Sequence, residues 1–391
     1  MDFTALMNNN IHNYKEIKSI YAISGVEGAW LNEHLTKDCG IVPYLLHKRY
    51  GYDSYIVSTK QGDYPYLDTY VKGLKMEFLD RFDSDSLKDY VIKNYRNMDV
   101  LIFHGMYPAY TIISILYKKL RPDGKIFMNL DANSTWMDSI LIDDVLWTTL
   151  LDNCDLIATS CKKMQRHLNI KWASWNIEYL PNGFYNFANL NMDIDYGKKE
   201  NTIITVGRIG LYVKANHVLM EAFALLYQKL PNWKLKLIGK VEDSFKAYIE
   251  EYFIRYPQLK DKVIFTGFIA DKEMLWNEYK SAKIFALTSI SEGGSPNVAA
   301  EAQINGCYMV ISDIDASDDI TNNEKCGRVF PVGNVEKLYE SLLEVCSDEK
   351  ELEKASYDII KYAKELLDWN HNIDRLNYMI NEKNENLVEG I

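Results

Sequence analysis

The chain has 391 residues, of which 47 % are hydrophobic and 25 % are charged, as in an ordinary globular protein. This length is too great for one core and predicts two domains, each with a sizeable core of its own. The formal net charge of −11 argues against non-specific nucleic-acid binding, which depends on neutralising phosphates. We therefore expect no nucleic-acid partner.

The cysteines and the N-terminus bear on the cellular compartment. The six cysteines are scattered, without Cys-x-x-Cys or zinc-ligand spacing, a pattern typical of reduced thiols in the cytosol. The first 18 residues are polar and lack the apolar core of a signal peptide. No stretch approaches the roughly 18 apolar residues of a membrane span. We expect a cytoplasmic protein, either in solution or peripheral at the inner face of the membrane.

The chain opens with a strand, a glycine turn and an amphipathic stretch. Ile17 to Ile23 reads as the strand, the turn contains Gly25 and Gly28, and the amphipathic stretch runs to about Arg49. This order is typical of a Rossmann-like domain. The turn reads Gly-x-x-Gly, whereas the dinucleotide fingerprint is Gly-x-Gly-x-x-Gly, so an NAD-dependent enzyme lacks its signature. A tight turn without a ligand is the alternative interpretation.

His104 follows a run that predicts a buried parallel strand, Asp99 to Phe103. Ligands of open α/β sheets bind at the carboxyl ends of strands, so His104 is a candidate functional residue, the alternative being a structural histidine. The same alternation predicts a helix over 109–120 and further strands over 53–58, 125–130, 155–160 and 177–180.

The second half repeats the alternation after a linker. Residues 185–200 lack periodicity and are rich in Asn, Asp and Gly, so we expect the linker there. A new strand over 202–206 leads into a loop that contains Arg208 and Lys214, and a helix follows from about Asn216. Further strands are predicted over 233–239, 263–269, 309–312 and 327–330, and helices over 335–345, 351–367 and from Trp369.

The most informative stretch runs from Thr288 to Gly306. A buried strand, a turn cluster over 292–297 and a helix from Val298 follow one another. A helix N-terminus delivered by a glycine-rich loop is a ready anion site. Glu292 and Glu301 bracket this loop, and carboxylates suit the sugar hydroxyls of a ligand, which donate hydrogen bonds to them. A capped surface helix with solvated glutamates is the alternative.

This paired-glutamate loop resembles the signature of retaining family-four glycosyltransferases. The Arg208–Lys214 loop and Pro181-Asn182-Gly183 are similar to other parts of that family. The resemblance implies an α/β fold of two facing Rossmann-like domains, called GT-B. The expected parts are an acceptor domain over 1–190, a nucleotide-sugar donor domain over 191–365, and a C-terminal helix over 366–391 that returns to the first domain.

The resemblance also implies roles for individual residues. Arg208 and Lys214 would grip the donor diphosphate and stabilise the charge that develops as the sugar leaves. Glu301 would hold the ribose, Glu292 would lie near the donor sugar, and His104 would contact the transferred sugar. Eight residues separate the two glutamates, one more than usual in the family, so Glu301 carries over more safely than Glu292. The other expected donor-binding residues are Gly25, Gly28, Gly267, Phe268, Gly294, Ser295, Pro296 and Asn297.

The implied activity is transfer of a sugar, with retention of configuration, from a UDP-linked donor to a glycan, lipid-linked or protein acceptor. The setting would be bacterial cell-surface polysaccharide or glycoconjugate synthesis. No carboxylate is placed as an obvious nucleophile, which favours front-face attack assisted by the leaving diphosphate. We expect no cofactor and no metal, with Arg208 and Lys214 as charge stabilisers. Asp313-Ile314-Asp315 matches a metal motif by letters, but we interpret it as a solvated loop.

Three other classes of protein remain as alternatives, one of them the NAD-dependent enzyme, whose fingerprint is absent. The paired-glutamate loop argues against a sugar-nucleotide epimerase or an inverting transferase. A catalytically silent partner subunit that binds a glycan or another transferase is supported by the extra residue and the divergent first loop. It is opposed by the intact cations Arg208 and Lys214 and by Glu301.

The sequence also contains two short basic segments, over 118–121 and 162–166. We interpret them as solvated helix faces, the alternative being contact with anionic lipid or an acidic glycan.

Overall fold

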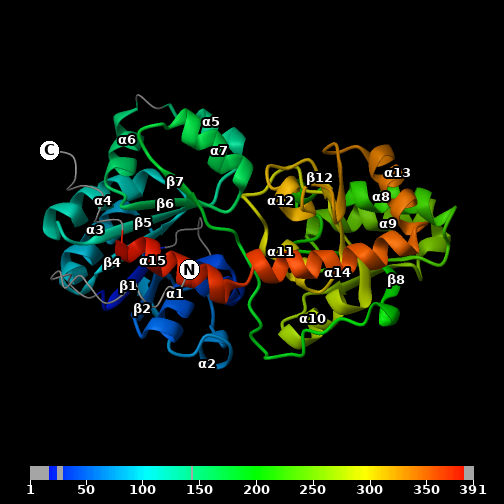
Figure 1. Ribbon diagram of the computed structural model, residues 1–391, viewed down its shortest axis with the longest axis horizontal. Helices are drawn as coiled ribbons and strands as arrows, with labels where there is room; N and C mark the ends of the chain where they lie inside the picture. Colours follow the sequence, from blue (N-terminus) through cyan, green and yellow to red (C-terminus); the bar gives the residue numbers. More distant parts are fainter. Residues whose placement is uncertain (1–16, 24–29, 142–143, 383–391) are drawn as a thin grey trace, which may run out of the picture.

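The computed structural model describes residues 17–23, 30–141 and 144–382. It contains two parallel sheets, each flanked by helices, which lie side by side along the long axis (Figure 1). The first sheet has the order β3-β2-β1-β4-β5-β6-β7 and the second β10-β9-β8-β11-β12-β13. Both orders are Rossmann-like, which confirms the predicted fold. We call the two halves domain 1 and domain 2.

The strands agree closely with the hydrophobic runs of the sequence. Those of domain 1 are β1 (Ser19–Ile23), β2 (Asp53–Thr59), β3 (Lys75–Leu79), β4 (Val100–His104), β5 (Lys125–Leu130), β6 (Leu156–Thr159) and β7 (Ile177–Tyr179). Those of domain 2 are β8 (Glu200–Val206), β9 (Lys234–Ile238), β10 (Val263–Gly267), β11 (Ala282–Leu287), β12 (Tyr308–Ser312) and β13 (Gly327–Phe330). The central strands are buried on both faces, because helices cover both sides of each sheet.

Helices connect most of the successive parallel strands. Domain 1 contains α1 (Asp38–Tyr50), α2 (Tyr66–Thr69), α3 (Ser84–Asn94), α4 (Pro108–Leu120), α5 (Ser134–Ser139), α6 (Val145–Asp152) and α7 (Lys162–Lys171). Domain 2 contains α8 (Asn216–Tyr227), α9 (Lys246–Arg255), α10 (Lys272–Ser281), α11 (Asn297–Ile304), α12 (Ser317–Thr321), α13 (Val335–Cys346) and α14 (Glu349–Leu366). None of the helices in the described ranges is long and apolar enough to span a lipid bilayer.

The last helix, α15 (Trp369–Glu382), returns from domain 2 and packs on α1 of domain 1, as the resemblance implied (Figure 1). Trp369 is buried at the crossing. Arg49 donates to both carboxylate oxygens of Asp374, with distances of 2.8 and 2.6 Å. The bidentate geometry fixes the register of α15 on domain 1.

The helix expected directly after the first glycine turn is interrupted. A 3₁₀ segment, Asn32–Thr36, comes first, and α1 begins only at Asp38 because Lys37 is extended. Gly40 then packs against the 3₁₀ segment so closely that a Cβ would lie 2.5 Å from the carbonyl oxygen of Leu35. This break places Asp38 and Cys39 at the N-terminus of α1, facing the space between the domains.

The prediction of a solvated loop at Asp313-Ile314-Asp315 is wrong for Asp315. Its carboxylate accepts hydrogen bonds from the Ser134 amide at 2.7 Å and the Ser134 hydroxyl at 2.9 Å, at the start of α5. Asp319 accepts from the Lys162 amide at the start of α7, at 2.8 Å. Two carboxylates of domain 2 thus dock on helix N-termini of domain 1, where unpaired amides and the helix dipole favour negative charge.

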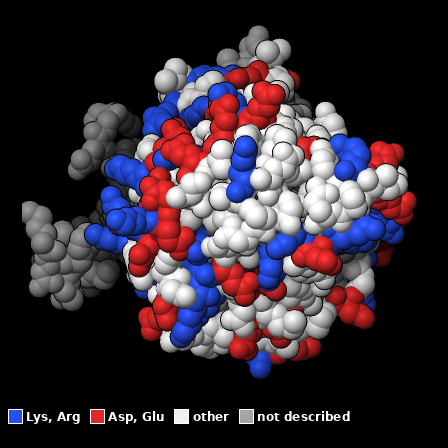
Figure 2. All heavy atoms as spheres, turned by 90° about the vertical axis from the view of Figure 1, so that its right-hand side faces the viewer, with Lys and Arg blue, Asp and Glu red and all other residues white. Residues whose placement is uncertain are grey.

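The outer end of domain 2 carries interspersed charges of both signs (Figure 2). Ion pairs within domain 2 include Arg255 with Glu221 at 2.6 Å and Arg328 with Glu344 at 3.0 Å. Exposed pairs of this kind contribute little to stability. Positive and negative side chains alternate across the face in view.

The fold yields a prediction at Gly239, directly after β9. Its φ is +142°, and a Cβ there would lie 1.7 Å from the carbonyl oxygen of Gly207. Gly239→Ala should destabilise the protein by about 3 kcal/mol or more, because overpacking and backbone strain each contribute about 1–3 kcal/mol.

Gly333→Ala is the matched control, since Gly333 has a φ of +74° but a Cβ added there would meet nothing within 4 Å. Gly333→Ala should lower the free energy of unfolding by only about 1–2 kcal/mol, the cost of holding an alanine in the left-handed conformation. Thermal and urea unfolding of both variants measure the difference, and equal losses would contradict the close approach of Gly239 to Gly207.

Candidate active site

Each sheet has a topological switch point, the place where the order of its strands reverses, and both switch points lie toward the space between the domains. In domain 1 the switch lies between β1 and β4, and in domain 2 between β8 and β11. The strand order reverses there, which leaves a crevice at the carboxyl ends of the strands. His104 ends β4, the Arg208–Lys214 loop follows β8, and the glycine-rich loop follows β11.

Lys214 and Glu292 meet across this switch point. The Lys214 ammonium donates to Glu292 Oε1 at 2.5 Å, and the Ser289 hydroxyl donates to the same oxygen. The side chains of Lys214 and Glu292 are only 22 % and 13 % exposed, respectively. Because β8 and β11 are parallel neighbours, their following loops share one edge of the sheet. The family resemblance placed Glu292 near the donor sugar; the structure places it against the cation expected at the diphosphate.

The Lys214 loop is held in an uncommon backbone conformation. Ala215, a buried residue, has a φ of +44°, in the left-handed region that L-residues rarely adopt. The Asn216 side chain accepts from the Gly210 amide at 2.7 Å, and Thr288 donates to the Lys214 carbonyl at 2.9 Å. These contacts fix the direction of the Lys214 side chain. Strained residues of this kind cluster at functional sites.

Arg208 lies on the same edge but is far more open. Its side chain is 63 % exposed, and Nε donates to Glu242 Oε1 at 2.9 Å. The sequence analysis missed Glu242. It follows β9, the strand beside β8, so its position at the same sheet edge could have pointed to it.

Glu301 lies on α11 and already has a hydrogen-bond donor. The Tyr279 hydroxyl donates to Glu301 Oε2 at 2.9 Å. A small pocket beside it is lined by Lys272, Trp276 and the linker residues Tyr185 and Phe187. Burial lowers the pKa of Lys272, and the nearby Glu301 carboxylate acts in the opposite direction. Neither Tyr279 nor Lys272 was predicted, since each lies within a helix without a motif.

The glycine-rich loop touches domain 1 through its backbone. A Cβ on Gly293 would lie 2.2 Å from Asp131 Oδ1, and one on Gly294 would lie 2.3 Å from Ser160 Oγ. The Ser295 amide donates to Ser160 at 3.0 Å, and its carbonyl accepts from Asn182 at 2.8 Å.

His104 lies between two carboxylates of domain 1. Its Nε2 is 3.2 Å from Asp38 Oδ2 and 3.6 Å from Asp131 Oδ2, and its side chain is 10 % exposed. Burial alone lowers the pKa of His104, but Asp38 and Asp131 outweigh it and raise the pKa to about 9. The other oxygen of Asp38 accepts from the Asn297 side chain of domain 2 at 3.2 Å. Asp38 was not predicted, because no motif precedes it.

The remaining predicted residues divide between the cleft and the first glycine turn. The Gly267 carbonyl accepts from the Gly239 amide at 3.0 Å, and Phe268 is 54 % exposed. The Tyr66 hydroxyl of domain 1 donates to the nearby Ala270 carbonyl at 2.7 Å. Pro296 is the N-cap residue of α11. Gly25 and Gly28 lie outside the described residues, so their predicted role stays a prediction.

Two Rossmann-like domains that face each other across their switch points, with a C-terminal helix returning to the first, define the GT-B class of glycosyltransferase folds. Residues 191–366 match the family described as glycosyl transferases group 1. The matched part of the chain contains Arg208, Lys214, Glu292 and Glu301.

Curated relatives match about half of the chain or less. An uncharacterized glycosyltransferase of Haemophilus influenzae is 24 % identical over 192 residues, which cover 48 % of this chain and 52 % of the relative. The poly(glycerol-phosphate) alpha-glucosyltransferase of Bacillus subtilis is 29 % identical over 147 residues, which cover 37 % of this chain and 21 % of the relative. The chain thus aligns with about half or less of the length of these curated relatives.

Solved structures match nearly the whole chain in fold. Sucrose-phosphate synthase from Thermosynechococcus elongatus is 16 % identical, with a TM-score of 0.68, and the match covers 93 % of this chain and 98 % of that one. The Anabaena protein HepE in complex with UDP is 15 % identical, with a TM-score of 0.70 and coverages of 92 % and 98 %. At these identities the likeness concerns the fold alone.

The environment of His104 predicts a pH-dependent contribution to stability. The pKa of about 9 in the folded chain lies above the ordinary value of 6.5. The charged imidazole therefore stabilises the fold fully below pH 6.5, and this contribution is lost as the pH rises through about 9.

NMR titration of the seven histidines, with His104→Gln for assignment, measures this pKa. Asp38→Asn should move the midpoint of His104 downwards by about one unit or more, because an adjacent carboxylate favours the charged form. A midpoint near 6.5 in the unmodified protein would contradict the ion pairs.

Proposed function

We propose that the protein is a retaining glycosyltransferase that moves a sugar from a nucleotide-sugar, most simply a UDP-sugar, to a hydroxyl of a glycan, lipid-linked or protein acceptor. Domain 2 binds the donor and domain 1 the acceptor, in the synthesis of cell-surface polysaccharide or glycoconjugate. The observation that carries this proposal is the group at the domain 2 switch point, where Arg208 and Lys214 lie at the same sheet edge as Glu292. The UDP complex of HepE, a protein of the same fold, supports the choice of nucleotide.

Donor binding exchanges the partners of the two cations. Lys214 is paired with Glu292 and Arg208 with Glu242, so a diphosphate replaces or shares these carboxylates. The Arg208 guanidinium offers a planar fork to phosphate oxygens, whereas the Lys214 ammonium is a compact point charge. Glu301 accepts from the ribose hydroxyls in place of, or beside, the Tyr279 hydroxyl.

Catalysis follows from where the charge develops. The bond between the anomeric carbon and the phosphate oxygen breaks, and the acceptor oxygen forms its bond on the same face of the sugar. Because the acceptor attacks directly, no enzymic nucleophile is needed, and because its proton passes to the departing phosphate oxygen, no enzymic base is needed. Arg208 and Lys214 interact more strongly with the free diphosphate than with the intact donor, which lowers the barrier.

The first test is binding of UDP without metal. Calorimetry in EDTA should show binding, because the cations of domain 2 supply the positive charge. Glu301→Ala should weaken it by about 1.5–3 kcal/mol, the usual contribution of a hydrogen bond to a charged group. Binding that is lost in EDTA and restored by magnesium or manganese would contradict the metal-free site, and an unchanged affinity in Glu301→Ala would contradict the ribose contact.

The second test separates turnover from stability. Arg208→Ala should lower turnover of the preferred nucleotide-sugar by about a hundred- to a thousandfold. Its melting temperature should hardly change, because an exposed side chain contributes within about 0.5 kcal/mol. Lys214→Ala should lower both quantities, since it leaves the nearly buried Glu292 without its cation.

Lys229→Ala is the matched control for charge, because Lys229 is exposed just beyond the end of α8 that is far from Lys214. It should retain full turnover. Near-normal turnover of a folded Arg208→Ala protein would contradict the mechanism and favour the silent partner subunit.

A further inference from the structure

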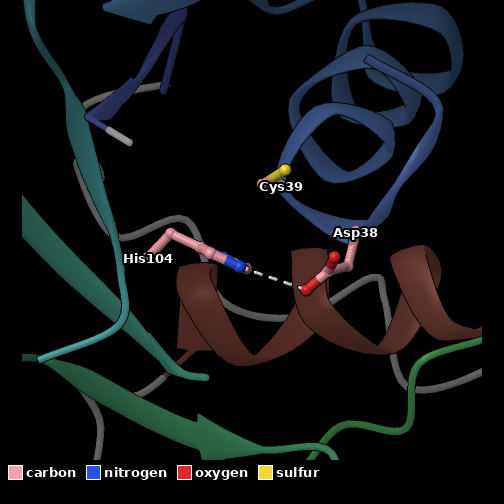
Figure 3. Close-up of side chains that lie close together, drawn as sticks. All are labelled: Asp38, Cys39 and His104. Carbon is pink, nitrogen blue, oxygen red and sulfur yellow. Dashed lines mark ion pairs between the residues drawn. The ribbon is translucent and has the colours of Figure 1, made fainter. Parts of the chain in front are cut away.

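A thiol, an imidazole and a carboxylate meet on the domain 1 side of the cleft. In the part of the chain that the structure describes, Asp38, Cys39 and His104 form the one group of three potential metal ligands whose donor atoms all lie within 4.8 Å of one another. Asp38 and Cys39 begin α1 and His104 ends β4 (Figure 3). Asp38 is 7 % and Cys39 8 % exposed.

The surroundings of this cluster favour a positive charge at its centre. Nε2 of His104 faces both Asp38 and Asp131, at 3.2 and 3.6 Å. Among the residues that the structure describes, the Cys39 thiol donates one hydrogen bond, to the His34 carbonyl oxygen at 3.5 Å. A cation among these groups would therefore meet the carboxylate of Asp38, the imidazole of His104 and a sulfur whose present hydrogen bond is weak, with the negative charge of Asp131 nearby.

The donor set selects the kind of cation. Mg²⁺ and Ca²⁺ prefer oxygen ligands alone, whereas Zn²⁺ accepts Cys sulfur, His nitrogen and carboxylate oxygen in a tetrahedral arrangement. Two nitrogen or oxygen ligands of one tetrahedral Zn²⁺ lie about 3.3 Å apart, given metal–ligand distances of about 2.0 Å. The separation of 3.2 Å between His104 Nε2 and Asp38 Oδ2 fits this value.

We propose that Asp38, Cys39 and His104 form a binding site for zinc or a similar thiophilic divalent cation, with a water molecule as the fourth ligand. Binding replaces the thiol proton of Cys39 and a proton at Nε2 of His104, both released to solvent. No oxidation or reduction takes place. Metal binding is independent of the proposed transferase activity.

A bound cation would also inhibit transfer, and this second part rests on the proposed function. The ion would occupy Nε2 of His104, the group expected to face the donor sugar. It would also hold Asp38, whose other oxygen contacts Asn297 at the start of α11. The ion would thus block the histidine that is expected to face the donor sugar, and it would alter the Asp38–Asn297 contact between the domains.

Cobalt(II) is the probe for the site, because its spectrum reports both ligand type and geometry. The full chain, stripped by chelator and kept reduced, is titrated with Co²⁺ alone. We expect one equivalent to bind, with a thiolate-to-cobalt charge-transfer band in the near ultraviolet and the intense visible bands of tetrahedral Co²⁺. One equivalent of Zn²⁺ should displace it.

Three variants test the assignment of ligands. Cys39→Ser should abolish the charge-transfer band, and His104→Gln should weaken Co²⁺ binding by more than about a hundredfold, since even outer-shell partners contribute tenfold to a hundredfold. Cys154→Ser is the matched control, because Cys154 lies in the turn between α6 and β6 and outside this cluster. It should bind Co²⁺ like the unmodified chain. Cys39→Ala replaces Cys39→Ser if the latter melts at a lower temperature.

The activity readout is separate, and each protein is compared with its own rate in the absence of metal. Stoichiometric Zn²⁺ should inhibit turnover in the unmodified chain and in Cys154→Ser, but not in Cys39→Ser. Absence of the charge-transfer band in the unmodified chain, or an equal band in Cys39→Ser, would overturn the metal site. A band without inhibition would overturn only the inhibitory role, and a chain that binds Co²⁺ but turns over no nucleotide-sugar would count against the proposed function alone.

Discussion

The cleft depends on the close approach of the glycine-rich loop to domain 1. Gly293 and Gly294 leave no room for a side chain, because a Cβ on either would overlap Asp131 or Ser160. Their backbone can therefore lie directly on the ends of β5 and β6, and the Ser295 amide bonds to Ser160. This contact sets the His104 cluster of domain 1 opposite the Lys214–Glu292 pair of domain 2. The carboxylates of Asp315 and Asp319 support the same arrangement from the next loop and helix.

A second feature is that three cationic side chains of the candidate site, those of Lys214, Arg208 and His104, are paired with carboxylates of the protein. Lys214 bonds to Glu292, Arg208 to Glu242, and His104 lies between Asp38 and Asp131. Burying an isolated charge is unfavourable, so such pairing keeps the site stable without a ligand. It also means that ligand binding is an exchange of partners. The exposed Arg208 exchanges most easily, whereas Lys214 is shielded by the loops around it.

The two proposals concern opposite walls of this cleft. Arg208, Lys214, Glu292 and Glu301 belong to domain 2, and the thiol–imidazole–carboxylate cluster belongs to domain 1. Asn297 connects them, since it begins α11 and contacts Asp38. A change in the partner of Asp38 would therefore reach the helix that bears Glu301. Under these two proposals, domain 1 takes part in control as well as in acceptor binding.

The sequence alone determined the alternation of strands and helices, because buried parallel strands are continuous apolar runs and glycine clusters mark the turns between them. It also indicated Arg208, Lys214, Glu292 and Glu301, since local motifs place them directly after strands or on a helix start. Only the tertiary structure decided their partners. Glu242, Tyr279, Asp38 and Asp131 come from other strands and helices, and Asp315 proved to dock on α5 instead of lying in solvent. Contacts between segments that are far apart in the sequence depend on how the two sheets face each other. A local pattern of residues does not determine how the sheets are placed, so it cannot predict these contacts.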